Sequence, residues 1–274
     1  MTTIIAQSFG YCAPRSQGEL GDVLAENERV KILAGGTDLL VDMRNGNSRP
    51  ALVVDIKKVE GFRDITWDEN GGLSIGPAAT INDMLRHEVV QRRFPVLVSC
   101  GEDLASYQIR NRATVAGNIV NASPCADMAP GLLCLGASAV IASRDGERTV
   151  PFTDFFIGVK RTVLQRGEVL ARIVIPAEMA DARGGYRKLK RIKGHDLGII
   201  GVALLKKDGR VSLGISSSAP TPLYVEGLSE SDSTQTVVDA AGAAIRPISD
   251  VRCTAEYRAH MVRVYTRRLM EEVA

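Results

Sequence analysis

The sequence predicts an α+β fold made of two or three packed units. A chain of 274 residues is long for a single hydrophobic core. Near the N-terminus, an apolar segment passes through a glycine turn into a helical segment, and a second apolar segment follows. This pattern indicates a small strand–helix–strand unit. From Gly61 onward, short alternating segments separated by polar turns predict antiparallel hairpins.

The first unit is expected to cover about residues 1–57, beginning with a lead-in and a turn. Ser16 is a typical N-cap residue, and apolar side chains share one face of the helix that would follow it. The strand, glycine turn and helix over residues 31–43 would direct unpaired backbone N–H groups at an anion. The predicted elements are a helix at 17–27, a strand at 31–34, a helix at 39–43 and a strand at 51–55.

The second unit is expected to cover about residues 58–176. Residues 69–72 are a turn signal between two strands, and Thr80 is placed to cap the helix after them. The aromatic residues of 152–156 are expected to pack in the core. The predicted elements are strands at 62–67 and 73–76, helices at 81–87, 95–104 and 128–135, and strands at 138–143, 148–150 and 170–175.

A change of composition after Pro176 predicts a domain boundary there, with domain 1–176 followed by a smaller C-terminal domain, 177–274. This smaller domain is expected to hold a three-stranded antiparallel sheet and two helices. Lys207-Asp208-Gly209 is a hairpin turn signal between two of the strands. The predicted elements are strands at 186–193, 198–206 and 210–217, and helices at 233–244 and 255–273.

Charge and hydropathy argue against several classes of partner. The net charge is +2, with acidic and basic residues interspersed, so neither nucleic acid nor an anionic membrane is expected as a partner. No apolar stretch approaches the roughly 20 residues that span a bilayer, so no membrane span is expected. The N-terminus lacks the basic segment and long apolar core of a secretory signal, and the chain is therefore expected to be cytoplasmic.

The cysteines and histidines indicate no metal site within this chain. Five scattered cysteines without a Cys-x-x-Cys pair are typical of reduced thiols, and they argue against a zinc or iron–sulfur centre. Only three histidines occur, and none has a helical pair spacing that would favour zinc.

Two polar stretches that contain glycine are the candidate binding segments. In residues 114–127, Gly117 would let the backbone turn tightly and expose N–H groups, and Pro124 would fix the turn. A polar loop between two apolar segments could have the same composition. However, residues 34–38 form a second stretch of the same character. Polar side chains of the longer stretch that could hydrogen-bond a ligand are Thr114, Asn118, Asn121, Ser123 and Asp127.

Neither of two common nucleotide motifs is present at residues 34–38. The stretch lacks the Gly-Lys-Ser/Thr ending of a P-loop, which argues against nucleoside triphosphate chemistry. It also lacks the third glycine of the dinucleotide Gly-x-Gly-x-x-Gly fingerprint. Taken alone, a Gly-Gly turn could also be a helix start that needs only small residues.

Taken together, three segments resemble the FAD-binding medium subunit of the molybdenum hydroxylases, the family that contains xanthine dehydrogenase and carbon monoxide dehydrogenase. They are Ala-Gly-Gly-Thr-Asp-Leu-Leu at 34–40, Ile-Arg-Asn-Arg-Ala-Thr-Val-Ala-Gly-Asn-Ile at 109–119 and Ser-Pro-Cys-Ala-Asp-Met-Ala-Pro at 123–130. The order and spacing of the segments fit this family along essentially the whole chain. The resemblance implies that domain 1–176 has the two-subdomain FAD-binding fold of the PCMH or vanillyl-alcohol-oxidase type.

The resemblance also implies which residues contact FAD. Asp127 would hydrogen-bond the flavin side, and Leu104 and Leu170 would pack on the cofactor. Lys188 would reach the flavin ring, where a cation favours negative charge on the reduced flavin; the other interpretation is a surface lysine on a basic strand. The amides of the first loop, which hold the diphosphate, belong to Ile32, Leu33, Ala34, Gly35, Gly36, Thr37, Asp38 and Leu39. The second loop, which approaches the same diphosphate, comprises Thr114, Ala116, Gly117 and Asn118, with Ser123 beyond it.

Two positions depart from the family pattern. The second loop commonly has two adjacent glycines, and here Ala116 replaces the first of them. Its methyl group is tolerable only where the backbone has negative φ. An arginine usually follows the lysine by four residues, but Ile192 stands there and Arg191 lies one place earlier.

The resemblance implies an electron-transfer flavoprotein subunit with no substrate oxidation of its own. Non-covalent FAD would take electrons from two [2Fe–2S] clusters of a small partner subunit and pass them to an external acceptor. A large partner subunit would hold the molybdenum cofactor, in a dimer of heterotrimers. One alternative is a stand-alone FAD oxidoreductase, which would need a longer substrate domain than the ~100 residues after Pro176. Another is a scaffold subunit without cofactor, which Ala116 keeps open.

Overall fold

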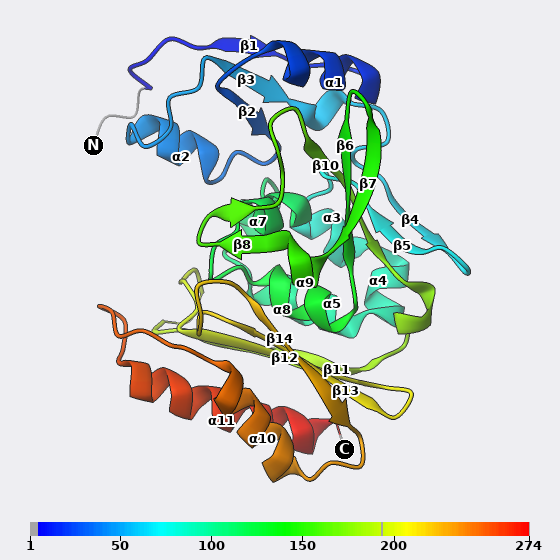
Figure 1. Cartoon of the computed structure of the whole chain (residues 1–274), viewed down its shortest axis with the longest axis vertical. Helices are drawn as coiled ribbons and strands as arrows, with labels where there is room; N and C mark the ends of the chain where they lie inside the picture. Colours follow the sequence, from blue (N-terminus) through cyan, green and yellow to red (C-terminus); the bar gives the residue numbers. More distant parts are fainter. Residues whose placement is uncertain (1–4, 193, 274) are drawn as a thin grey trace.

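Three groups of elements follow one another down the long axis of the molecule, in the order of the sequence (Figure 1). The computed structural model describes residues 5–192 and 194–273. The predicted α+β class is confirmed, because helices and sheets occur in every group. Lys193, where a predicted strand ended, lies outside the described residues, as do Met1 to Ile4 of the predicted lead-in and Ala274.

The N-terminal group is a three-stranded parallel sheet with strand order β1-β3-β2. The predicted strand–helix–strand unit is confirmed, because β2 and β3 pair in parallel and α2 connects them. Ser16 caps α1 as expected, its side chain accepting a hydrogen bond from the Glu19 amide. The elements are β1 (Gly10–Cys12), α1 (Gln17–Glu26), β2 (Val30–Leu33), α2 (Leu39–Arg44), β3 (Leu52–Asp55) and the 3-10 helix η1 (Ile56–Lys58).

The middle group combines a five-stranded antiparallel sheet, in the order β4-β5-β10-β6-β7, with a set of short helices. Thr80 and Asp83 form a capping box at the start of α3. The strand predicted from residue 62 begins at Ile65, because Gly61 (φ +76°) and Phe62 form a turn.

The elements of the middle group fall into two stretches of sequence. The first holds β4 (Ile65–Asp68), β5 (Gly72–Ile75), α3 (Ile81–Arg86), α4 (Glu88–Arg93), α5 (Pro95–Asp103), α6 (Tyr107–Arg110), α7 (Val115–Val120) and α8 (Met128–Cys134). The second holds β6 (Ser138–Ser143), β7 (Gly146–Pro151), α9 (Phe152–Phe155), the hairpin β8 (Phe156–Gly158) and β9 (Arg161–Thr162), β10 (Val169–Ile175) and the 3-10 helix η2 (Ala177–Met179).

The C-terminal group has a four-stranded antiparallel sheet, in the order β11-β12-β13-β14, so the prediction of three strands was wrong in number. The missed strand β14 lies at the sheet edge. Its alternation is broken by Gly227 (φ +77°) and by a register shift opposite Val211 and Leu213. The elements are β11 (Arg183–Leu189), β12 (Ile200–Lys207), β13 (Arg210–Ser216), β14 (Leu223–Ser229), α10 (Thr234–Ala244) and α11 (Ala255–Glu272).

The C-terminal sheet packs on both faces. Helices α10 and α11 cover one face, and α5 and α8 of the middle group cover the other (Figure 1). Tyr186, Ala203 and Leu205 of this sheet belong to the same apolar core as the helices of the middle group. The division of the chain into domains 1–176 and 177–274 stays a prediction. Within the described residues, no helix is both long enough and apolar enough to cross a bilayer.

Helix α8 lies so close to β13 that a side chain between them has no room. A Cβ atom built on Gly214 would overlap the carbonyl oxygen of Pro130 and lie 2.8 Å from its Cα. Backbone atoms cannot move aside as the end of a flexible side chain can. The absence of a side chain at Gly214 therefore sets the distance between the C-terminal sheet and the helix that begins after Asp127.

Gly214→Ala is expected to destabilise the protein by about 1–3 kcal/mol, because the methyl group would overpack a contact between backbones. Thermal unfolding would measure this as a melting temperature lowered by several degrees. Gly185→Ala in the same sheet is the matched control, because its Cβ would meet only Leu269 Cδ2, at an ordinary 3.8 Å. Equal melting temperatures for the two variants would contradict this account of the α8 contact.

Candidate functional site

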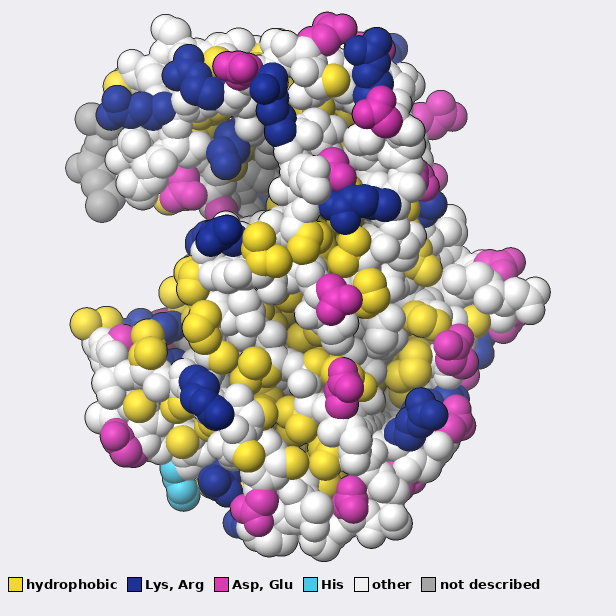
Figure 2. Space-filling model, viewed as in Figure 1, with side chains coloured by type: hydrophobic (Ala, Val, Ile, Leu, Met, Phe, Trp, Pro, Cys, Tyr) yellow, Lys and Arg dark blue, Asp and Glu magenta, His cyan; other side chains and the backbone are white. Residues whose placement is uncertain are grey.

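A cavity of about 1090 Å³ lies between the N-terminal sheet and the middle group. Figure 2 shows the surface hollowed at this level. The walls come from β2, α2, α7, the segment before α8 and β10, with residues 195–197 of the C-terminal group adding to them. Both candidate binding segments therefore line one cavity, although more than 70 residues separate them in the sequence.

The first candidate segment connects the end of β2 to the start of α2. Gly36 has a φ of +76°, which a residue with a side chain adopts only with strain. Within the described part of the chain, the backbone amides of residues 35–38 donate no hydrogen bond. All four of these residues line the cavity. The segment thus offers free N–H donors, as a binding loop for an anion does.

The second candidate segment differs from its prediction, because Gly117 lies in helix α7 and not in a tight turn. Thr114 is the N-cap of this helix, and its Oγ1 accepts a hydrogen bond of 2.9 Å from the Gly117 amide. A Cβ on Gly117 would lie 2.9 Å from the same oxygen. Glycine is needed here because of the close approach to its own cap, and not because of its backbone conformation.

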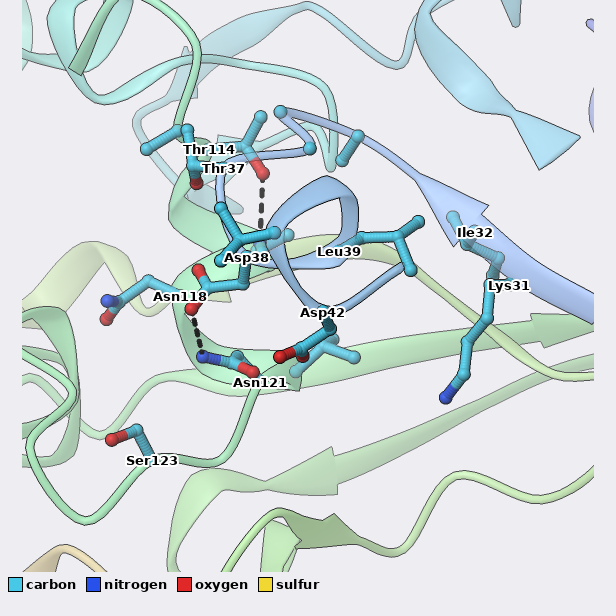
Figure 3. A pocket seen from close by; sticks show the side chains of 18 of the residues that line it. Lys31, Ile32, Thr37, Asp38, Leu39, Asp42, Thr114, Asn118, Asn121 and Ser123 are labelled. Carbon is cyan, nitrogen blue, oxygen red and sulfur yellow. Dashed lines mark hydrogen bonds between the residues drawn. The ribbon is translucent and has the colours of Figure 1, made fainter. Parts of the chain in front are cut away.

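The backbone of the first segment contacts the two residues that directly precede the second. A Cβ on Gly35 would overlap the carbonyl oxygen of Arg112 and lie 2.9 Å from the Cα of Ala113. Beside this contact, Asn121 Nδ2 donates to Asp38 Oδ1 over 3.2 Å (Figure 3). Lys160 Nζ donates to Asn121 Oδ1 over 2.8 Å. Gly35 thus allows the two loops to converge, and side chains hold them together.

A buried ion pair lies at the wall of the cavity formed by the segment before α8. Lys188 Nζ of β11 donates to Asp127 Oδ2 over 2.9 Å, and the Lys188 side chain is only 1% exposed. The Tyr186 hydroxyl donates to Asp127 Oδ1 over 3.1 Å. Burial raises the pKa of Asp127, while Lys188 and Tyr186 act to lower it. Burial also raises the pKa of Tyr186 well above its usual value, so its hydroxyl is a donor at neutral pH.

Comparison with known proteins identifies the family. Residues 7–178 match the FAD binding domain in molybdopterin dehydrogenase. The chain belongs to this family of FAD-binding domains. It is 31% identical to the carbon monoxide dehydrogenase medium chain of Hydrogenophaga pseudoflava, over 97% of both chains, and 30% identical to a putative xanthine dehydrogenase FAD-binding subunit of Escherichia coli, over 96% of both.

Solved structures agree with this assignment. Carbon monoxide dehydrogenase from Hydrogenophaga pseudoflava superposes with a TM-score of 0.90 over 97% of both chains, at 31% identity. A Cu,Mo-CO dehydrogenase superposes with a TM-score of 0.91 at 29% identity, over 98% of this chain. The expected resemblance to the FAD-binding medium subunits of molybdenum hydroxylases is therefore confirmed, and the chain is an oxidoreductase subunit of that family.

The residues of this FAD-binding subunit fit the cofactor of its family. The free amides at 35–38 suit a diphosphate, and the cavity is as large as a dinucleotide site requires. All but two of the predicted contact residues line the cavity. Leu33 packs instead against the turn at Gly36, and Lys188 lies behind Asp127. Those that line it are Ile32, Ala34, Gly35, Gly36, Thr37, Asp38, Leu39, Leu104, Thr114, Ala116, Gly117, Asn118, Ser123, Asp127 and Leu170.

The two departures from the family pattern have plain structural consequences. Ala116 is a helical residue of α7 without positive φ and is 3% exposed, so its methyl group causes no backbone strain. Ile192 is 62% exposed. Arg191 pairs with Asp196 over 2.9 Å and holds the pKa of that carboxyl well below its usual range.

Several cavity residues had no signal in the sequence. Lys160 belongs to the β8–β9 hairpin, and His195, Asp196 and Leu197 come from a loop of the C-terminal group. Basic side chains at the opposite end of the N-terminal sheet were missed as well. Single residues on separate loops form no local pattern, so only the tertiary arrangement identifies them. The basic residues are Arg29, Lys31 and Arg49.

Gly35→Ala is expected to reduce FAD affinity at least tenfold, because the methyl group would force the two loops apart. The ratio of FAD to protein after purification, and an FAD titration followed by fluorescence, would measure the loss. Ala116→Gly is the comparison variant and should keep affinity within about threefold, since it adds only helix flexibility. A Gly35→Ala protein that retains FAD like the wild type would disprove the role of the loop contact.

Proposed function

We propose that this chain is the electron-transfer flavoprotein subunit of a heteromeric molybdenum hydroxylase. Its non-covalent FAD would receive electrons from [2Fe–2S] clusters of a small partner subunit and pass them to an external acceptor. The observation that carries the proposal is the convergence of a loop with free amides, residues 35–38, and the capped start of α7 on one cavity.

The residues of the chain have separate tasks in this proposal. The free amides of residues 35–38 would bind the diphosphate through hydrogen bonds, and the start of α7 would face it with helix-terminal partial charge. Leu104 and Leu170, which are buried apolar residues of the cavity wall, would pack on the cofactor and exclude water. Asp127 would hydrogen-bond the flavin side. Bound FAD would supply the ability to accept and release electrons.

The names of the relatives support the proposal that this chain has partner subunits. The carbon monoxide dehydrogenase relatives are medium chains, and one matching structure is described as lacking the Mo-pyranopterin moiety of its molybdenum cofactor. We infer a small [2Fe–2S] subunit and a large molybdenum-cofactor subunit as partners, assembled as a dimer of heterotrimers. The near-complete coverage of chains named as subunits favours this proposal over a stand-alone oxidoreductase. The unstrained Ala116 removes the reason to expect a scaffold without cofactor.

The complex purified with its partners is expected to contain stoichiometric FAD whose absorbance near 450 nm bleaches when the molybdenum subunit is supplied with its substrate. The first compounds to test, under anaerobic conditions, are those named in relatives of this chain: carbon monoxide, xanthine, nicotinate and quinoline. In a complex that carries Gly35→Ala, the same compound should reduce the iron–sulfur clusters without flavin bleaching. A wild-type complex whose clusters become reduced while bound FAD stays oxidised would refute the electron-transfer role.

A further inference from the structure

The cluster of Asp127, Tyr186 and Lys188 contains a residue, Tyr186, to which the proposed function assigns no task. Tyr186 and Lys188 are two residues apart on β11, so their side chains leave the same face of the sheet. Each donates to a different oxygen of Asp127. Of the three, only Asp127 lines the cavity. The other two side chains therefore act on the cavity through this carboxylate.

The fold provides space for the Tyr186 hydroxyl. Gly201 of β12 pairs with Lys188 in the sheet register. A Cβ on Gly201 would overlap the Tyr186 hydroxyl oxygen and lie 3.0 Å from the Tyr186 ring carbon Cε2. The missing side chain of Gly201 thus lets the hydroxyl reach across the sheet surface to the carboxylate.

The charges around this cluster balance one another. Lys188 Nζ also donates to the carbonyl oxygen of Asp103 over 3.2 Å, and the Asp103 carboxylate pairs with Lys190 over 2.6 Å. The buried thiol of Cys100, whose pKa is raised well above its usual value by burial, adds no charge. The cavity wall therefore holds a neutral pair as long as Asp127 is ionised. The sequence led us to expect a lysine that reaches the flavin directly. Instead, Lys188 is paired with Asp127, and Asp127 lines the cavity.

We propose that Tyr186 is a positioning residue for the cofactor site: its hydroxyl holds Asp127 as a carboxylate beside Lys188, so that the wall stays neutral. This inference rests on the proposed function, because it concerns an FAD bound in the cavity. Its physical basis is that a buried carboxylate needs hydrogen bonds to remain charged. Without the hydroxyl, Asp127 would bind a proton more readily and leave the charge of Lys188 uncompensated.

The consequence has a definite sign. Removal of the hydroxyl raises the pKa of Asp127, since this hydrogen bond acts to lower it. At pH values below that pKa, the cluster gains one positive charge, which stabilises the reduced cofactor and raises its midpoint potential. At higher pH, the carboxylate is ionised with or without Tyr186, and the difference disappears. The midpoint potential of the wild type shows the same rise only at lower pH, because its Asp127 binds a proton less readily.

Potentiometric titrations of the FAD in the purified complex, at pH values from about 5.5 to 8.5, test this inference. Absorbance near 450 nm follows the flavin, and absorbance near 550 nm allows the iron–sulfur contribution to be subtracted. Tyr186→Phe should favour reduction by about tenfold at low pH, or about 30 mV for a two-electron couple, and converge with the wild type at high pH. Tyr224→Phe, whose hydroxyl contacts Ser212 in the same sheet, should follow the wild type throughout.

Asp127→Asn gives an independent reading, because asparagine cannot ionise. Its midpoint potential should lie above that of the wild type at high pH, where the wild-type carboxylate is ionised, and adding Tyr186→Phe to Asp127→Asn should not change it at any pH. Parallel curves for Tyr186→Phe and the wild type, or a pH-dependent effect of Tyr186→Phe that persists when Asp127 is also replaced by Asn, would overturn the inference while leaving FAD binding intact. A wild-type complex without FAD would instead overturn the proposed function.

Discussion

The contact of Gly35 with the backbone of Arg112 and Ala113 is the constraint on which the cavity depends. Any side chain at position 35 would collide with main-chain atoms, which cannot rotate away. This single approach brings a loop of the N-terminal sheet against the segment that leads into α7. Free amides from one loop and a capped helix start from the other then face the same space. Without the approach, each would be an isolated turn that binds an anion weakly.

The wall near Asp127 depends on a second close approach, between Gly214 and Pro130. It sets the distance between the C-terminal sheet and α8, and so brings Tyr186 and Lys188 within hydrogen-bond distance of Asp127. A buried ion pair gains little over well-packed apolar residues, because both charges lose their hydration. Breaking such a pair costs several kcal/mol, however, because an uncompensated charge remains in the interior. The ion pair therefore fixes how the C-terminal sheet packs on the middle group more than it adds to the overall stability.

The sequence predicted what local patterns determine. Caps at Ser16 and Thr80, the glycine turn after β2 and most strands follow from short-range rules, and the structure has them near the predicted positions. The FAD-contact residues expected from the family resemblance stay a prediction, but all except Leu33 and Lys188 line one cavity. Long-range features were not predictable in the same way. Lys188 could be assigned to the flavin, but its partner Asp127 lies 61 residues away, and no local pattern encodes that pairing.

The two wrong predictions, for β14 and for Gly117, also come from contacts between residues that local patterns do not show. Strand β14 was missed because an edge strand needs no strict alternation, and a bulge with a glycine interrupts what alternation it has. Gly117 was placed in a turn because glycine often serves there, whereas here the cap at Thr114 leaves no space for a Cβ. In both cases a non-covalent neighbour, and not the residue's own conformational preference, decides the structure.

In the proposed function, this arrangement would separate the affinity for FAD from the tuning of its midpoint potential. The segments at residues 34–38 and 112–121 contact each other but share no hydrogen bond with Tyr186 or Lys188 in the part of the chain that the structure describes. Free energies of changes at sites without shared partners usually add. The amides that would bind a diphosphate can therefore stay fixed while the charge near Asp127 varies.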